Sequence, residues 1–180
     1  MDFKQHLILL RNAFEKSNIP ELKRLSGEFA GDAFIHYRKE NIQMSIIAYA
    51  CAKFLEKPYI LADPAWDSFR KSLLSLLEKA LQDWSSGKQA PAFAKVAKAL
   101  SLIERLGADL GRFVFGIIEK AKLKAGAEIY AHGASLGTAA ELSGAEKKEL
   151  SSYIAATRMP EKYVTKSVAQ RMQDAKKIFS

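Results

Sequence analysis

The sequence predicts an all-α protein, a multi-helix bundle of about eight or nine helices. Two observations lead to this prediction. Apolar residues recur at helical spacing through nearly every segment, and no convincing run alternates apolar and polar residues as a strand does. The composition fits a globular protein, because 48% of the 180 residues are hydrophobic and 27% are charged. No internal repeat of fixed period is visible.

Two helices are expected at the beginning of the chain. The first has one apolar stripe, formed by Phe3, Leu7, Leu10 and Phe14. It ends before Pro20, and a second helix runs from Glu21 to about Arg38. Within that second helix, Gly27 and Gly31 either weaken the helix or allow another helix to cross closely.

The middle of the chain contributes three further helices. One runs from Asn41 to Glu56 and is ended by Lys57-Pro58. Asp63-Pro64 starts the next, because aspartate caps free N–H groups and proline fits the first turn. Its inward side chains are Trp66, Phe69, Leu73, Leu77 and Trp84. After a polar loop, Pro91 opens a helix that ends near Gly107.

A long helical segment from Asp109 to His132 follows, and Gly133 is a natural C-terminal cap for it. The last helix is expected at about Pro160 to Phe179. We therefore divide the chain into an N-terminal helical bundle, residues 1–108, and a C-terminal part, residues 109–180. The C-terminal part holds the long helix, a helical hairpin and the last helix, and it can form one compact unit.

The sequence gives no sign of a membrane or secreted protein. Its apolar runs are too short to span a bilayer, and the N-terminus lacks the features of a signal peptide. The single cysteine, Cys51, lies in an apolar helical segment, so we expect a buried thiol and no disulfide. A cytoplasmic location and no membrane partner are expected.

The chain is basic, with a formal net charge of +8 and a pI near 9.5. A positive excess favours polyanionic partners, although many basic proteins bind nothing acidic. Residues 119–180 carry 11 basic and 7 acidic side chains, and residues 1–118 carry 17 and 13. The same excess of four therefore falls within about half the length in the C-terminal part.

No pattern of catalytic or metal-binding residues is visible. His6, His36 and His132 are far apart in the sequence, and none stands at ligand spacing from another suitable side chain. His6 is expected on a polar face or boundary, and His132 in the last turn of a helix. There is no phosphate-binding loop and no nucleophile elbow. We therefore expect a protein that is not an enzyme and has no cofactor or metal.

The most informative stretch, residues 135–154, is typical of two short helices joined by a tight turn. Gly144 permits the positive φ angle of such a turn. Ala140 is small enough for the two helices to cross closely, and Leu150 supplies an apolar anchor on the second helix.

Over about residues 128–154, the chain resembles the helix-turn-helix superfamily. The matching elements are a cap at Ser135, a first helix Leu136–Ser143, a turn at Gly144-Ala145 and a second helix Glu146–Ala156. The packing positions of the family correspond to Ala139, Ala140, Ala145, Leu150 and Tyr153. As a whole the chain looks like helical proteins of archaea.

The resemblance implies a DNA-binding regulatory protein that acts through its C-terminal helix-turn-helix. The second helix of such a motif enters a DNA groove, and hydroxyls near helix N-termini contact phosphates. The implied nucleic-acid contacts are Ser135, Thr138, Lys147, Lys148, Ser151, Ser152, Arg158, Lys162 and Lys166. The usual two-site geometry of these proteins implies a homodimer formed through the N-terminal helices.

A structural interpretation of the same stretch stays open. Glu146 and Glu149 stand at the start of the second helix, where carboxylates face phosphates unfavourably. Ser143 and Glu146 also fit a capping box, a device that only stabilises a helix. On this interpretation the chain is a helical scaffold or adaptor for a protein or ribonucleoprotein. RNA binding is a variant of both hypotheses.

Overall fold

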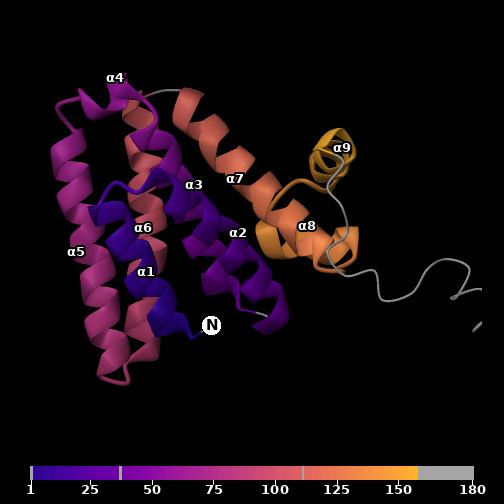
Figure 1. Cartoon of the computed structure of the whole chain (residues 1–180), viewed down its shortest axis with the longest axis horizontal. Coiled ribbons are helices and arrows are strands. Elements are labelled where there is room, and N and C mark those ends of the chain that lie inside the picture. Colours follow the sequence, from indigo (N-terminus) through magenta and orange to yellow (C-terminus); the bar gives the residue numbers. More distant parts are fainter. Residues whose placement is uncertain (1, 37, 111, 158–180) are drawn as a thin grey trace, which may run out of the picture.

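The computed structural model describes residues 2–36, 38–110 and 112–157, without the side chains of residues 107–110 and 112–115. Within those residues the chain is entirely helical and has no strand, which confirms the predicted fold class (Figure 1). The helices are α1 (Phe3–Glu15), α2 (Ile19–His36), α3 (Lys39–Leu55), α4 (Pro58–Leu61), α5 (Trp66–Ser85), α6 (Gln89–Leu110), α7 (Arg112–Ala131), α8 (Leu136–Ser143) and α9 (Lys147–Thr157).

Helix α3 is the centre of the bundle. It contacts α1, α2, α6 and α7, and its side chains are buried nearly all round the helix. The predicted stripe of α1 is confirmed, since Phe3, Leu7, Leu10 and Phe14 are all buried. Cys51 on α3 is fully buried as expected, and this burial raises the pKa of its thiol.

Several helix boundaries differ from the predicted ones, and α5 begins at Trp66 instead of at Asp63-Pro64. Helix α2 begins at Ile19, before Pro20, because proline fits the first turn of a helix. Proline opens the short helix α4 at Pro58 in the same way, where we expected only the end of α3. Helix α6 continues past Gly107 to Leu110, and α7 begins at Arg112 instead of Asp109.

Helices α5 and α6 form an antiparallel hairpin. The turn between them uses Gly87, whose φ of 76° favours glycine, and the Lys88 N–H donates to the Asp83 carbonyl at 2.8 Å. Trp84, expected inside, is half-buried, and its ring centroid lies 4.5 Å from that of Phe3. The hairpin covers one side of the bundle, with α5 against α1 and α6 against α3.

Helix α7 joins this bundle to α8 and α9. It contacts α2, α3 and α6, and it also contacts α8 and α9, which lie away from the α5–α6 hairpin (Figure 1). Helix α8 has the predicted bounds, and α9 begins one residue later than expected. Gly144 has the left-handed φ of 69° that the turn requires, and Ala140 and Leu150 are buried.

Two glycines of α2 receive side chains of α7. Gly27 faces Glu128 and Gly31 faces His132, so the two helices run side by side with a constant offset along this contact. A Cβ atom on Gly31 would lie 2.8 Å from Nε2 of His132. The glycines therefore allow the close crossing that was one of the two predicted outcomes.

His6 is fully buried, so its predicted place on a polar face or boundary is wrong. Its Nε2 lies 2.9 Å from Oδ2 of Asp32 on α2, and its ring packs on Phe29 with centroids 4.5 Å apart. Burial lowers the pKa of His6, although the carboxylate of Asp32 acts in the opposite direction. The partner on α2 makes this burial tolerable, and it is not visible in the local sequence.

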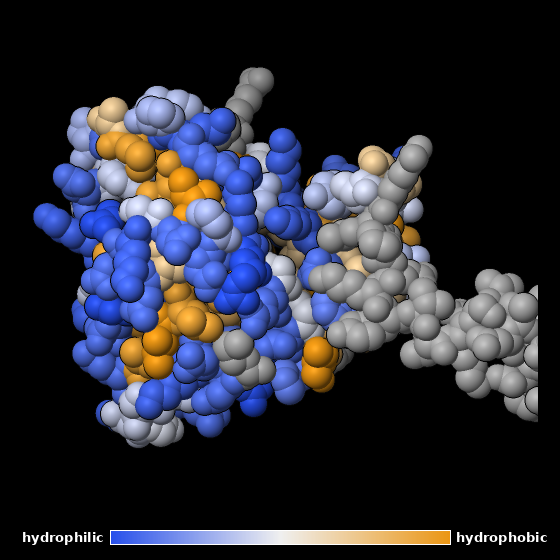
Figure 2. Space-filling model, viewed as in Figure 1, coloured by the Kyte–Doolittle hydropathy of each residue, from blue (hydrophilic) through white to orange (hydrophobic). Residues whose placement is uncertain are grey.

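The described helices include none that is long and apolar enough to cross a membrane. Most of the face seen in Figure 2 is hydrophilic, with separate apolar patches on the side where α1, α4 and α5 lie. The predicted last helix, residues 160–179, lies outside the described residues.

Candidate functional site

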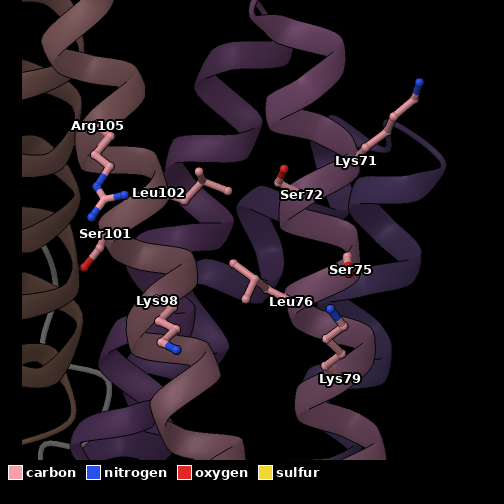
Figure 3. A pocket seen from close by; sticks show the side chains of 9 residues that line it. All are labelled: Lys71, Ser72, Ser75, Leu76, Lys79, Lys98, Ser101, Leu102 and Arg105. Atoms are coloured by element: carbon pink, nitrogen blue, oxygen red, sulfur yellow. The ribbon is translucent and has the colours of Figure 1, made fainter.

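The outer surface of the α5–α6 hairpin carries a groove of about 680 Å³. Its lining residues come from both helices and are Lys71, Ser72, Ser75, Leu76, Lys79, Lys98, Ser101, Leu102 and Arg105. Leu76 and Leu102 point toward each other between the two helices (Figure 3). Lys71 and Arg105 lie near one end of the groove, and Lys79 and Lys98 lie near the other (Figure 3).

The amphipathic pattern of the two helices determines which residues line this groove. In α5, the inward positions Phe69, Leu73 and Leu77 are buried, and residues 71, 72, 75 and 79 fall on the outer face. In α6, Val96 and Ile103 are buried in the same way. Because the helices are antiparallel, their two polar faces meet along one groove.

The charge of the groove is uniformly positive. Four of its nine lining residues are basic and exposed, and none is acidic. Within the described residues, no carboxylate forms an ion pair with these four side chains. Several other basic side chains do have carboxylate partners, namely Arg11, Lys23, Arg24, Lys53, Lys95 and Lys122. Among the described side chains, the groove therefore keeps a positive charge that no ion pair compensates.

Three serine hydroxyls, Ser72, Ser75 and Ser101, lie among the basic groups and are exposed. Ammonium, guanidinium and hydroxyl groups are the side chains that most often contact phosphate oxygens. The basic residues of each helix span about 10 to 12 Å along its axis at 1.5 Å per residue. The groove can thus bind an extended anionic chain or several separate phosphates.

A smaller hollow of about 170 Å³ continues the groove toward the start of α5. It shares Ser72, Leu102 and Arg105 with the groove. Ser68 and Phe69 are among its other lining residues, and Phe69 is buried. The Arg105 end of the groove is therefore open to a longer ligand.

The predicted nucleic-acid contacts lie elsewhere, on α8 and α9. Ser135 is the N-cap of α8, where its Oγ accepts from the Thr138 N–H at 3.1 Å. The four predicted residues of α9 are all exposed: Lys147, Lys148, Ser151 and Ser152. Arg158, Lys162 and Lys166 lie outside the described residues.

Glu146 caps α9, so the capping box with Ser143 is wrong. The Glu146 carboxylate accepts from the Glu149 N–H at 2.7 Å, whereas Ser143 Oγ accepts from Ala145 N–H at 3.3 Å. Backbone N–H groups of residues 149 and 148 lower the pKa of Glu146. The start of α9 therefore carries Glu146 and Glu149 beside Lys147 and Lys148, and these four charges cancel.

Sequence reasoning missed the groove on α5 and α6. A signal was present in the sequence. Lys71 and Lys79 are separated by about two helical turns, as are Lys98 and Arg105, and the groove-lining residues between them are uncharged. The antiparallel pairing that joins the two faces is tertiary and cannot be read from local spacing.

No group of three or more metal-capable side chains is present in the described part of the chain. Comparisons with models of protein families, with curated proteins and with solved structures give no match to this chain. The function is therefore inferred from the geometry of the chain itself.

Proposed function

We propose that this chain is a non-enzymatic nucleic-acid-binding protein that binds the phosphate backbone in the α5–α6 groove. The observation that supports this proposal is the set of four exposed cations with no acidic lining residue. Phosphate contacts supply most of the affinity of sequence-independent nucleic-acid binding. An excess of positive charge over the whole chain speeds the encounter with such a partner.

Binding in this groove is expected to be independent of base sequence. None of the nine lining residues is aromatic, so the groove offers no platform on which bases could stack. Asn and Gln, the side chains that read adenine through paired hydrogen bonds, are also absent from it. Lysine, arginine and serine contacts to phosphates position a nucleic acid without reading its sequence.

We propose that the groove binds a single strand in preference to a duplex through phosphate contacts alone. The groove lies between two packed helices and is about 680 Å³, whereas a duplex presents its two backbones across grooves several ångströms wide. We therefore expect single-stranded DNA or RNA to bind more tightly than a duplex of the same length.

The C-terminal hairpin is retained as a second nucleic-acid contact within this function. The exposed lysines Lys147 and Lys148 support it, and the adjacent Glu146 and Glu149 weigh against a strong contribution. A regulatory role and a homodimer formed through the N-terminal helices belong to the same proposal.

Matched charge reversals test which surface binds. We compare three double variants. The groove variant combines Lys79→Glu and Lys98→Glu, the hairpin variant combines Lys147→Glu and Lys148→Glu, and the control combines Lys4→Glu and Lys39→Glu. All three change the net charge equally, and all six lysines are exposed. The control positions lie in the first turns of α1 and α3, where acidic residues are well tolerated.

Fluorescence anisotropy with labelled single-stranded DNA, single-stranded RNA and duplex DNA gives the affinities at low salt. We expect the groove variant to lose at least about tenfold in affinity, which corresponds to about 1.4 kcal/mol. The control should lose much less. Equal losses of affinity in all three variants would show that net charge alone explains the effect. Absence of binding by the wild type would contradict the proposal.

An adaptor that binds a protein or ribonucleoprotein is the second candidate function. The side chains of Tyr59 and Leu61 on α4 are 55% and 40% exposed, and apolar patches lie on the same side of the molecule (Figure 2). Such patches often mark protein interaction sites. Loss of a partner from Leu61→Ser, with unchanged nucleic-acid affinity, would favour this candidate.

A further inference from the structure

Three lysines from three helices converge where α7 meets α2 and α3. Lys23 on α2 and Lys53 on α3 both pair with Glu56, and the Lys53 Nζ lies 2.7 Å from Glu56 Oε2. Lys124 on α7 lies over the ring of Tyr49, with its Nζ 5.3 Å from the ring centroid. The Lys53 Nζ lies 5.7 Å from the same centroid. We call these three lysines the junction lysines.

Lys124 has an environment unlike that of a surface lysine. It is half-buried and lines a groove of about 560 Å³ between α2 and α7. It forms no ion pair with any carboxylate of the described residues, in contrast to Lys23 and Lys53. Burial, and then the positive charges of Lys53 and Lys23, hold the pKa of Lys124 below its ordinary value.

The charges of the junction do not balance. Lys23 and Lys53 share the Glu56 carboxylate, and Lys124 adds a third ammonium group without an ion pair among the described residues. Counting Glu128, which also lines the groove, the three lysines still exceed the nearby carboxylates by one positive charge. The face of Tyr49 attracts an ammonium group but carries no net charge. An anion bound beside Lys124 would supply the missing charge in a place that is partly shielded from water.

We infer that the junction lysines bind a phosphate group, with Lys124 as the principal contact. A phosphate monoester carries a charge of about −1.5 to −2 at pH 7, which is opposite in sign to the local excess. Lysine is a common phosphate ligand because its ammonium acts as a compact point charge. This site is separate from the α5–α6 groove and does not depend on nucleic-acid binding.

The composition of the groove fixes where the phosphate would lie. Glu128 lies one turn from Lys124 and faces Gly27, and Asp32 lies further along the groove; both carboxylates would repel an anion. Nearer to Lys23, Glu28 is already paired with Arg24. The phosphate is therefore confined to the end formed by Lys23 and Lys124.

A phosphate at this position would connect α2 and α7. It would bind the folded protein and not the unfolded chain, so it should raise the unfolding temperature in a saturable way. A negative charge near Lys124 should also raise the pKa of that lysine toward its ordinary value or above it.

Thermal unfolding and NMR titration of lysine Cε resonances test the site, with inorganic phosphate and a nucleoside monophosphate as probes. Chloride and acetate, added as sodium salts at matched ionic strength, serve as reference anions. Lys124→Gln is compared with Lys120→Gln, an exposed lysine one turn earlier on the same helix. Lys23→Gln is a second variant at an exposed position, which keeps the test decisive if Lys124→Gln folds poorly.

We expect phosphate to stabilise the wild type, Lys120→Gln and the groove variant of α5–α6 alike. Lys124→Gln should lose about tenfold or more in phosphate affinity, and Lys23→Gln should lose affinity as well. Stabilisation by inorganic phosphate alone would restrict the site to the free ion, and stabilisation by both probes would extend it to phosphate monoesters. Equal effects of phosphate and acetate, no saturable effect, or unchanged affinity in both Lys124→Gln and Lys23→Gln would overturn the inference.

Discussion

The imidazole ring of His132 lies against the backbone of Gly31, where a Cβ atom would come within 2.8 Å of Nε2 and 2.9 Å of Cε1. Real Cβ atoms do not approach neighbours so closely, so any side chain at position 31 would displace the ring or the helix. The ring is held from its other side, because Nδ1 of His132 lies 2.8 Å from the carbonyl oxygen of Glu128. This contact fixes how α7 sits on α2.

Gly31→Ala should therefore destabilise the protein. The overpacking is expected to lower the free energy of unfolding by about 1–3 kcal/mol, which exceeds the gain of about 0.5–1 kcal/mol from replacing a helical glycine. Urea denaturation measures the difference. Gly27→Ala is the matched control on the same helix, since its Cβ would meet nothing nearer than 3.9 Å. The control should be neutral or slightly stabilising.

His132→Ala should relieve the Gly31→Ala clash. In a double-mutant cycle, the second substitution is expected to cost less in the Gly31→Ala background than in the wild type. Strictly additive effects would show that the ring of His132 is not what excludes a side chain at position 31.

Leu150→Ala should release α9 from α7. Leu150 is fully buried, and its Cδ atoms lie 3.0 Å from the place of a Cβ on Gly126. Truncation of such a side chain costs about 2–5 kcal/mol. Hydrogen exchange should quicken in α8 and α9 before it does in α3. Ile154→Ala, at a half-buried position one turn later, is the control and should cost clearly less.

The free energy of unfolding should decrease as the pH is lowered below 6.5, the ordinary pKa of histidine. Because the pKa of His6 is lowered in the folded protein, the unfolded chain binds more protons between the two pKa values. The free energy of unfolding is therefore highest above pH 6.5, and it decreases as the pH falls from there toward the pKa of His6 in the folded protein. Burial lowers the pKa of His132 as well, and its contribution has the same sign.

Urea denaturation over this pH range, with His6→Gln and His36→Gln, checks the assignment. His6→Gln should flatten the dependence on pH, whereas His36→Gln, at an exposed position, should leave it as in the wild type. An unchanged slope in His6→Gln would contradict the role given to the buried ring.

Much of this fold could be predicted from helical periodicity, but its polar contacts could not. The stripe of Phe3 and Leu7 and the turn at Gly144 are local patterns, and both predictions are confirmed. The burial of His6 depends on Asp32, which lies 26 positions along the chain on another helix. Local spacing cannot reveal such a partner.

The α5–α6 groove and the junction lysines could not be predicted for the same reason. Each needs residues from two or three helices, and the sequence shows only which face of each helix is polar. Lys147 and Lys148, which the resemblance at residues 128–154 implies as nucleic-acid contacts, lie beside Glu146 and Glu149, which offset their charges. Four basic side chains with no acidic lining residue lie instead in the groove between α5 and α6.

The salt dependence of nucleic-acid binding tests the central claim most directly. Each cation that contacts a phosphate of a single strand contributes about −0.7 to the slope of log Kobs against log salt concentration. The four groove cations should together contribute about −3 to the slope of the wild type, and Lys79→Gln with Lys98→Gln should make the slope less negative by about 1.4. Lys4→Gln with Lys39→Gln should leave the slope unchanged. An unchanged slope in the variant that combines Lys79→Gln and Lys98→Gln would contradict phosphate binding between α5 and α6.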